Sequence, residues 1–149
     1  MAKRAYKRTT TPIYGLLHPA CGPIVRVEIH GHDGVLTQGL AVLDTGASMS
    51  AIDRDAARAL HLESPGAATW SAVSDGEGHR ATSALRRADL RIADDRRHWR
   101  MNLIEVAHLS SAVDGAIIVA LLGWDFLARC RLVCDGPAGT FSLELPRRN

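Results

Sequence analysis

Residues 40–52 read Leu-Ala-Val-Leu-Asp-Thr-Gly-Ala-Ser-Met-Ser-Ala-Ile, an apolar run that ends in an acidic residue and a turn. The apolar part predicts a buried strand; Asp44 follows it directly, and Gly46 supplies the turn. A carboxylate placed next to apolar side chains is costly to ionise, because burial removes the water that solvates the charge. Asp44 is therefore a candidate catalytic residue.

A second apolar run, residues 117–122, also ends at a glycine, Gly123. It predicts another buried strand, followed by one or two helical turns over residues 124–130. The rest of the sequence predicts hairpins over residues 23–43, 69–85, 88–106 and 132–145. A helix is predicted over residues 54–62, with Asp53 as its N-cap. The expected fold class is mainly β with one or two short helices.

The composition indicates one globular domain. Of the 149 residues, 46% are hydrophobic and 23% are charged, and the formal net charge is +2. Residues 1–11 are basic and rich in threonine, so we expect a flexible arm there and the domain over residues 12–149. We expect no membrane association, because no apolar run approaches roughly 20 residues. Three cysteines without a CxxC pair favour the cytoplasm.

The two motifs resemble those of the retropepsin-like aspartic proteases. Residues 44–46, Asp-Thr-Gly, match the active-site loop, and residues 121–123, Leu-Leu-Gly, match the segment before the short helix. The resemblance covers roughly residues 23–145 and leaves out the two terminal segments and residues 15–21. It is closest to the cellular and bacterial branch of the family. It implies a retropepsin-like acid-protease fold and the hydrolysis of peptide bonds.

Such proteases need two carboxylates that share one proton. The sequence contains one Asp-Thr-Gly and no second one, so the resemblance implies a homodimer in which Asp44 of each subunit completes the site. The expected partners are a second copy and an extended polypeptide substrate. No cofactor and no metal are implied; His30 and His32 alternate on a strand but have no third ligand nearby.

The resemblance also assigns roles to the neighbours of Asp44. Thr45 would send its hydroxyl to the loop of the partner subunit, and Gly46 would let the backbone approach water and substrate. Gly123 would pack beside the loop as a support. Ala47 lacks the hydroxyl that pepsin-like enzymes use to hydrogen-bond the catalytic carboxylate, so we expect a working pH nearer neutral.

The hairpin over residues 69–85 has a turn that would be the flap of the protease, closing over an extended peptide. Its residues are Asp75, Gly76, Glu77 and Gly78. In most proteins an Asp-Gly pair marks an ordinary exposed turn. The position of this turn between the two motifs is what favours a flap.

One departure from the viral members concerns an ion pair near their dimer interface. They place Arg after the glycine of the second motif and Asp two residues after the glycine of the first. Here those positions hold Trp124 and Ser48. Because both charges are absent together, no unpaired charge remains, and we expect a differently built interface.

Two other functions stay open from the sequence. A protease-fold dimer that binds extended peptides without cutting them would fit the changes at Ser48 and Trp124. The basic segments, residues 1–11 and 147–148, would fit a nucleic-acid-associated module derived from a mobile element. Beyond Tyr6 they carry no aromatic side chain for stacking on bases, so solvated tails are the better interpretation.

Overall fold

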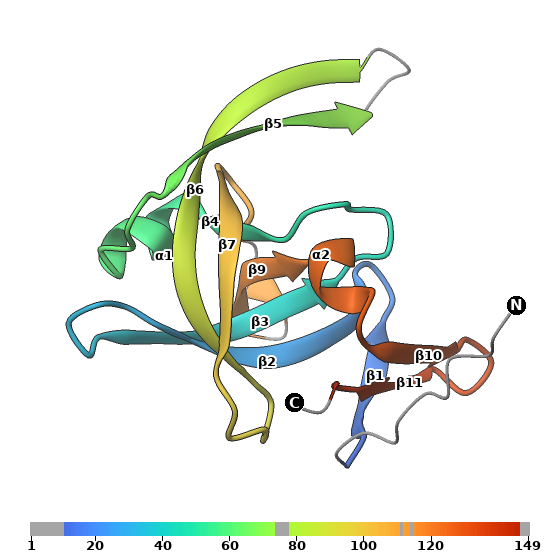
Figure 1. The fold of residues 1–149 in the computed structure, drawn as a ribbon. Coiled ribbons are helices and arrows are strands. Elements are labelled where there is room, and N and C mark those ends of the chain that lie inside the picture. Colours follow the sequence, from blue (N-terminus) through green and yellow to red (C-terminus); the bar gives the residue numbers. More distant parts are fainter. Residues whose placement is uncertain (1–10, 74–77, 111, 114, 147–149) are drawn as a thin grey trace, which may run out of the picture.

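Strands dominate the fold, and two short helices accompany them (Figure 1). The computed structural model describes residues 11–73, 78–110, 112–113 and 115–146. The strands are β1 (Ile13–His18), β2 (Gly22–His30), β3 (Leu36–Leu43), β4 (Ala51–Asp53), β5 (Gly66–Val73), β6 (Gly78–Ile92), β7 (Trp99–Val106), β8 (Ala112–Val113), β9 (Ala116–Leu122), β10 (Arg131–Asp135) and β11 (Thr140–Glu144). The helices are α1 (Arg54–Ala59) and α2 (Trp124–Leu127). The predicted fold class is confirmed.

Six of the strands close into a barrel. Neighbours pair in the order β2–β3–β9–β4–β7–β6, and β6 pairs back with β2. Alternate side chains of these strands point inward and form the core, where each fully buried aliphatic side chain contributes roughly 1.5–3 kcal/mol. The largest of them are Ile29, Ile52, Leu90, Ile92, Leu103 and Leu122.

A smaller sheet, β10–β11–β1, lies beside the barrel and is joined to it because β1 also pairs with β2 (Figure 1). Phe141 and Leu143 of β11 pack into the core. The hairpin predicted over residues 132–145 is present. Strand β1 was not predicted, because Tyr14 and Leu16 on its outward face are 75% exposed and obscure the apolar alternation.

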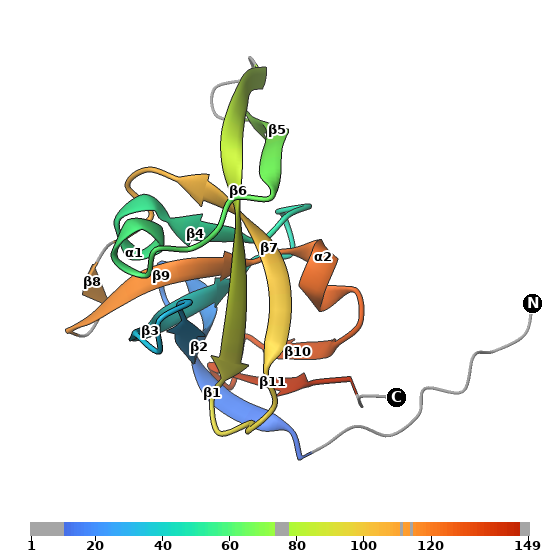
Figure 2. The ribbon, with the colours of Figure 1, turned by 60° about the vertical axis from the view of Figure 1, so that its left-hand side comes forward.

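The second and third predicted hairpins share one strand. β6 runs unbroken for 15 residues; its first half pairs with β5, and its second half pairs with β2 and β7. The predicted division of this strand into residues 79–85 and 88–92 is wrong. Figure 2 shows the result: the outer half of β6 and β5 form a hairpin that projects from the barrel.

Helix α1 is shorter than predicted, and α2 is a single turn within the segment predicted for it. The N-cap of α1 is Asp53, as expected, and its Oδ1 accepts the N–H groups of Asp55 (2.9 Å) and Ala56 (3.4 Å). His61 has a φ of 49°, a left-handed conformation that ends the helical segment before residue 62. Neither helix, within the described residues, is long and apolar enough to cross a membrane.

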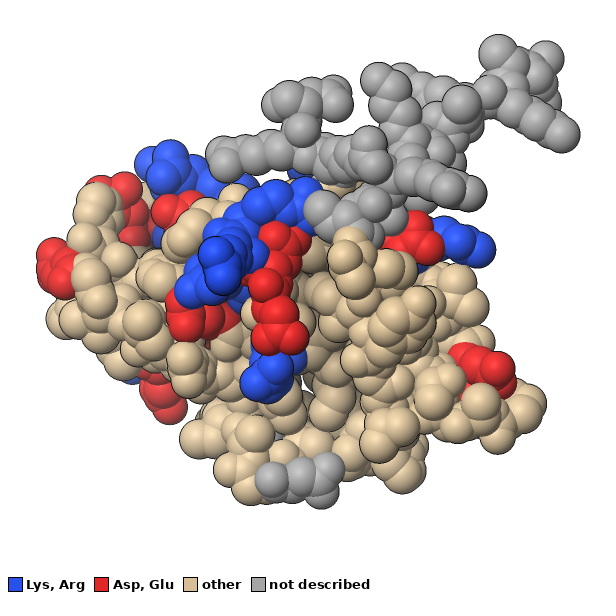
Figure 3. Space-filling view, turned by 90° about the horizontal axis from the view of Figure 1, so that it is seen from below, with Lys and Arg blue, Asp and Glu red and all other residues tan. Residues whose placement is uncertain are grey.

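Charges of both signs are interspersed on the face seen from below in Figure 3. Several arginines of the described residues are paired with carboxylates, among them Arg26 with Asp94 (3.3 Å) and Arg91 with Glu28 (3.1 Å). A surface of paired charges does not present the broad positive field that attracts a phosphate backbone. The arm expected at residues 1–11 lies outside the described residues, apart from Thr11.

Candidate active site

The two motifs meet at one edge of the barrel. β3 and β9 run parallel, with Val42 beside Leu121 and Leu43 beside Leu122, so both strands end at the same level. The N–H of Asp44 donates to the carbonyl oxygen of Leu122 over 2.9 Å and continues the ladder by one bond. Asp44 and the second motif, separate in the sequence, are therefore neighbours in space.

Asp44 opens a tight turn stabilised by its own side chain. The N–H of Gly46 donates to Oδ1 of Asp44 over 2.8 Å, and the N–H of Ala47 donates to the Asp44 carbonyl oxygen over 3.3 Å. The carboxylate is partly exposed, and Thr45 and Gly46 are exposed. No described residue donates a hydrogen bond to Oδ2 of Asp44, so that oxygen can accept further hydrogen bonds.

Gly123 lies directly against the loop of residues 44–50. A Cβ atom at this position would stand 2.8 Å from the carbonyl oxygens of both Ala47 and Met49. Because real Cβ atoms do not approach backbone that closely, the loop can occupy this position only beside a glycine. Gly123 is thus in close contact with the loop, and its role as a support of the active site stays a prediction.

Ser50 and Asp125, which were not predicted as site residues, fix the loop of residues 44–50. Ser50 is fully buried, and its N–H and hydroxyl donate to the two carboxylate oxygens of Asp125 over 3.0 and 2.6 Å. The Ser50 hydroxyl also accepts the N–H of Gly123 over 3.0 Å. These bonds fix the end of the loop to the start of α2. The one sign of this contact in the sequence is that Ser50, a polar residue, lies at the edge of an apolar strand.

Residues 48 and 124, where viral members carry an ion pair, lie here in segments that are connected by backbone hydrogen bonds. The N–H of Trp124 donates to the carbonyl oxygen of Ala47 (2.9 Å), and the N–H of Asp125 donates to that of Ser48 (3.2 Å). Together with the bonds of Ser50, they attach α2 to the loop without a charge at residues 48 or 124. The indole of Trp124 is left 49% exposed.

Residues 25–126 match the family model of the aspartyl proteases, which spans the chain from β2 to α2 and includes both motifs. The chain belongs to the aspartyl protease family. Membership supports peptide hydrolysis as the reaction. No curated protein matches the chain. The matched residues contain the barrel except for the first three residues of β2, whereas β1, β10 and β11 of this aspartyl protease lie outside them.

The hairpin of β5 and β6 projects from the barrel of the protease (Figures 1 and 2). Three of the residues expected to form the flap, Asp75, Gly76 and Glu77, lie outside the described residues. Gly78 is the first residue of β6 and pairs with Val73 of β5. A hairpin is thus present in the part of the sequence that separates the two motifs, as predicted. Its closure over a substrate stays a prediction.

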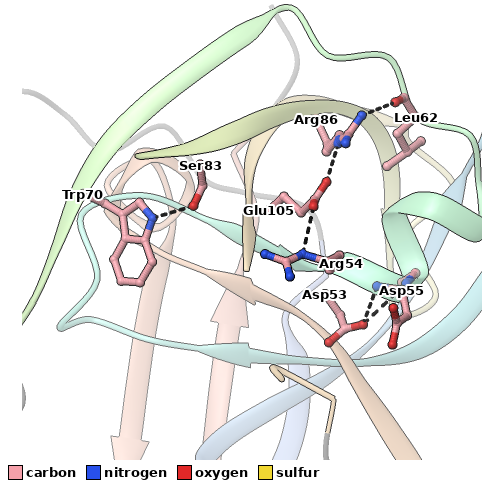
Figure 4. A network of polar contacts seen from close by, with 9 residues as sticks. Asp53, Arg54, Asp55, Leu62, Trp70, Ser83, Arg86 and Glu105 are labelled. Atoms are coloured by element: carbon pink, nitrogen blue, oxygen red, sulfur yellow. Dashed lines mark hydrogen bonds and ion pairs between the residues drawn. The ribbon is translucent and has the colours of Figure 1, made fainter. Parts of the chain in front are cut away.

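A buried carboxylate fixes the base of this hairpin (Figure 4). Glu105 on β7 is 8% exposed and accepts hydrogen bonds from Nε of Arg86 (2.6 Å) and Nε of Arg54 (3.1 Å). Arg86 also donates to the carbonyl oxygen of Leu62 over 3.1 Å. The network joins β6, β7 and α1 where the hairpin leaves the barrel, and it explains why β6 stays extended through its arginines.

The histidines considered as metal ligands pair with different carboxylates of the protease. Nε2 of His30 lies 2.6 Å from Oε1 of Glu28, and Nε2 of His32 lies 2.9 Å from Oε1 of Glu63. The part of the chain that the structure describes holds no group of three or more His, Cys, Asp or Glu side chains arranged for a metal ion. These histidines therefore form separate polar contacts.

Proposed function

We propose that this aspartyl protease is a retropepsin-like endopeptidase of the cellular and bacterial branch that acts as a homodimer. The observation that carries the proposal is a single Asp-Thr-Gly per chain, presented on an exposed turn with one carboxylate oxygen free of described hydrogen-bond donors. Residues 12–149 form the catalytic domain. Free cysteines support the cytoplasm as its location.

In the dimer the two Asp44 carboxylates face each other across the two-fold axis and share one proton. The ionised carboxylate takes a proton from water, whose oxygen attacks the carbonyl carbon of the substrate peptide. The protonated carboxylate gives its proton to the carbonyl oxygen, and a tetrahedral diol forms. The carboxylate that took the proton from water then gives it to the leaving nitrogen, while the other carboxylate takes a proton from a hydroxyl of the diol. The C–N bond breaks, a carboxylic acid and an amine are released, and the pair again holds one proton.

We infer that the second copy binds at a groove next to the loop of Asp44. It has a volume of about 730 Å³ and runs from the loop to β10. Its lining residues are Thr45, Trp124, Leu127, Cys130, Arg131, Leu132 and Cys134. Because Thr45 is next to Asp44, a second copy seated on this groove would bring its own loop close to the first. We call these lining residues the dimer face.

The strand at the border of the dimer face has a free edge. Among the described residues β10 pairs with β11 alone, and four of its five residues are exposed. An exposed edge strand presents unpaired N–H and C=O groups that another strand can complete. Antiparallel pairing of β10 with β10 of a second copy would satisfy these groups around a two-fold axis.

Cleavage of denatured casein by the wild-type chain and by Asp44→Asn tests the proposal. We expect the wild-type chain to cut casein, with a rate per chain that rises with protein concentration as dimers form. Asp44→Asn should not cut, since an amide cannot accept the proton of water. Light scattering at several concentrations should show the dimer for both. A strict monomer that cuts casein would refute the homodimer.

The same experiment distinguishes the endopeptidase from a dimer that binds peptides without cutting them. If neither protein cuts casein or a peptide library, but both bind extended peptides equally, the chain is a peptide-binding member of the family. The nucleic-acid alternative gains no support from the face seen in Figure 3, where charges of both signs are interspersed. Deletion of residues 1–11 should leave both the dimer and casein cleavage intact.

A further inference from the structure

A pocket lies between the small sheet and the turn that joins β6 to β7. It has a volume of about 720 Å³ and is lined by residues of β1, β2 and β11 and by residues 93–96, and we call it the lower pocket. In Figure 1 this turn is at the bottom of the view, and the projecting hairpin is at the top. No described residue of the loop 44–50 lines the lower pocket, so it is separate from the candidate active site.

The floor of the lower pocket is apolar and belongs to the packed fold. Val25, Phe141 and Leu145 are at most 4% exposed and are part of the hydrophobic core, and Ile13 packs against that core. The ring of Phe141 lies over the backbone of Gly15, where a Cβ atom would stand 2.4 Å from it. Because only glycine leaves room for the ring at this position, the floor has a fixed shape.

Hydrogen bonds attach the turn between β6 and β7 to the rest of the lower pocket. The N–H of Ala93 donates to the carbonyl oxygen of Arg26 over 2.8 Å. The carboxylate of Asp95 accepts Nε of Arg97 over 2.9 Å, and Nη1 of Arg97 donates to the carbonyl oxygen of Pro146. The lower pocket is therefore formed without a ligand, and its volume falls in the range of roughly 300–1,000 Å³ that is typical of ligand sites.

The charges around the lower pocket leave one positive group unpaired. Four of its lining residues are charged. Arg26 pairs with Asp94 over 3.3 Å, and Asp95 pairs with Arg97. Arg96 is exposed and has no hydrogen bond or ion pair with a described residue. A guanidinium presents several donors in one plane and binds carboxylates through two parallel hydrogen bonds, so the rim is suited to a carboxylate.

Tyr14 provides an aromatic wall at the rim. Its side chain is 75% exposed, and its hydroxyl has no hydrogen bond with a described residue. An exposed tyrosine offers an apolar ring and one polar atom to a ligand. An apolar floor, an aromatic wall and an unpaired guanidinium together match a ligand that has an apolar body and one anionic end.

We propose that the lower pocket binds a small amphipathic carboxylate of the fatty-acid class. Arg96 binds the carboxylate at the rim, and the hydrocarbon chain lies against Tyr14 and the apolar floor. Burial of the chain supplies most of the affinity, so small hydrophilic anions are excluded. The inference goes beyond the proposed endopeptidase and does not depend on it, because it uses none of the residues of that site.

Isothermal titration calorimetry with decanoate, below the concentration at which it forms micelles, tests the proposal. We expect one decanoate per chain. Octanoate should bind about tenfold more weakly, because it buries two methylene groups fewer. Decylammonium, which has the same chain and the opposite charge, should also bind at least roughly tenfold more weakly. Equal binding of decanoate and decylammonium would overturn the role of the guanidinium.

Variants of two exposed side chains, whose loss leaves the core intact, locate the site. Arg96→Gln should weaken decanoate binding by about tenfold or more, as expected for the loss of a charged hydrogen bond. Tyr14→Ala should weaken it by about fivefold, since the chain loses its wall. Arg58→Gln removes an exposed arginine of α1 and is the matched control for net charge, with wild-type affinity expected. If Arg96→Gln and Arg58→Gln bind decanoate equally, the proposal is wrong.

Backbone amide NMR shifts on decanoate addition should be centred on residues 12–14, 24–26 and 93–96. Shifts centred on residues 44–50 would overturn the proposal, because the ligand would then occupy the candidate active site. Asp44→Asn should bind decanoate with wild-type affinity whether or not the wild-type chain cuts casein, so the two proposals fail independently.

Two further measurements test other occupants of the lower pocket. A variant without residues 1–10, which precede Thr11 at the rim, should bind decanoate as the wild-type chain does. Binding by the truncated variant alone would overturn the proposal in favour of the chain's own N-terminal segment. Binding to vesicles of phosphatidylglycerol without binding of free decanoate would overturn it in favour of a membrane surface.

Discussion

Ser50 and Asp125, 75 positions apart in the sequence, are joined by two hydrogen bonds that use both oxygens of the carboxylate. Ser50 is the last residue before β4, and Asp125 lies in the first turn of α2. The pair therefore connects the end of the loop of residues 44–50 to the helix that follows the second motif. It stabilises the loop that holds Asp44 without touching the reacting atoms.

Replacing Asp125 with alanine should weaken both stability and activity. The buried N–H and hydroxyl of Ser50 would lose their acceptors, which costs about 1–3 kcal/mol, and the loop would position Asp44 less well. We expect kcat to fall by roughly 10–100-fold with a smaller change in KM, measured on casein-derived peptides. Asp94→Ala, which removes an exposed carboxylate paired with Arg26, is the control and should have wild-type kinetics.

Gly123→Ala tests the close approach between the second motif and the loop. The added Cβ would meet the carbonyl oxygens of Ala47 and Met49 at 2.8 Å, so we expect a loss of about 1–3 kcal/mol in the free energy of unfolding. Urea denaturation measures it. Gly136→Ala adds the same methyl group where no atom lies within 4 Å, and it should leave the midpoint unchanged. Equal midpoints for both variants would contradict the packing described for the loop.

Glu105→Ala should be among the more destabilising substitutions. It would leave the guanidinium of Arg86 without its 2.6 Å partner in a largely buried position, and breaking such a pair costs about 3 kcal/mol or more. Thermal unfolding is the measurement. Arg100→Ala breaks the exposed pair with Asp89 and should leave the melting temperature within error of wild type. If the two variants melt alike, the network does not fix the base of the hairpin.

Asp53 should contribute to the acid stability of the fold. Burial of its carboxylate raises its pKa, but hydrogen bonds from the N–H groups of Ser110, Asp55 and Ala56 outweigh burial and leave the pKa below its usual range. A lowered pKa means that the contribution is full above the unfolded value, about 3.9, and is lost as pH falls through the folded value.

Asp53→Asn is the variant that tests this. It keeps a capping side chain but removes the charge, so the free energy of unfolding should be lower than that of wild type at pH 7 and should converge with it as the pH falls through the lowered pKa of Asp53 in the folded protein. Urea titrations between pH 2 and pH 7, about the range over which a carboxylate titrates, are the measurement. A difference that stays constant over this range would show that the charge of Asp53 does not matter.

The resemblance of the two motifs to those of the retropepsin-like proteases was sufficient to predict that Gly123 lies beside the loop of Asp44. It was not sufficient for Ser50 and Asp125. Each has an ordinary local explanation, a polar residue at a strand edge and an acid in the first turn of a helix. Their bond depends on the parallel pairing of β3 and β9, which brings distant segments together.

Two parts of the fold escaped prediction for similar reasons. β1 places Tyr14 and Leu16 on an exposed face, so its apolar residues do not alternate with polar ones. The predicted hairpins end at residue 85 and begin again at residue 88, so they leave out Arg86 and Arg87. In the structure Arg86 pairs with Glu105 and remains in the strand, a contact that local sequence cannot reveal.

Trp124→Ala tests the dimer face. Removing a half-exposed indole beside Thr45 should raise the dissociation constant of the dimer by about tenfold or more, as expected for an aromatic at the centre of an interface. Activity should fall at low protein concentration and recover when the concentration is raised, because the catalytic residues are intact. Activity that is low at every concentration would mean that Trp124 acts inside the site instead.

Subunit mixing tests most directly whether two chains share one reaction centre. Asp44→Asn chain is added in increasing amounts to a constant amount of wild-type chain, and casein cleavage is measured after the subunits exchange. Because mixed dimers hold one carboxylate, we predict that an equal amount of variant reduces the activity to about half, and a ninefold excess to about a tenth. Activity that stays constant as the variant is added would contradict a catalytic site built from two Asp44 residues.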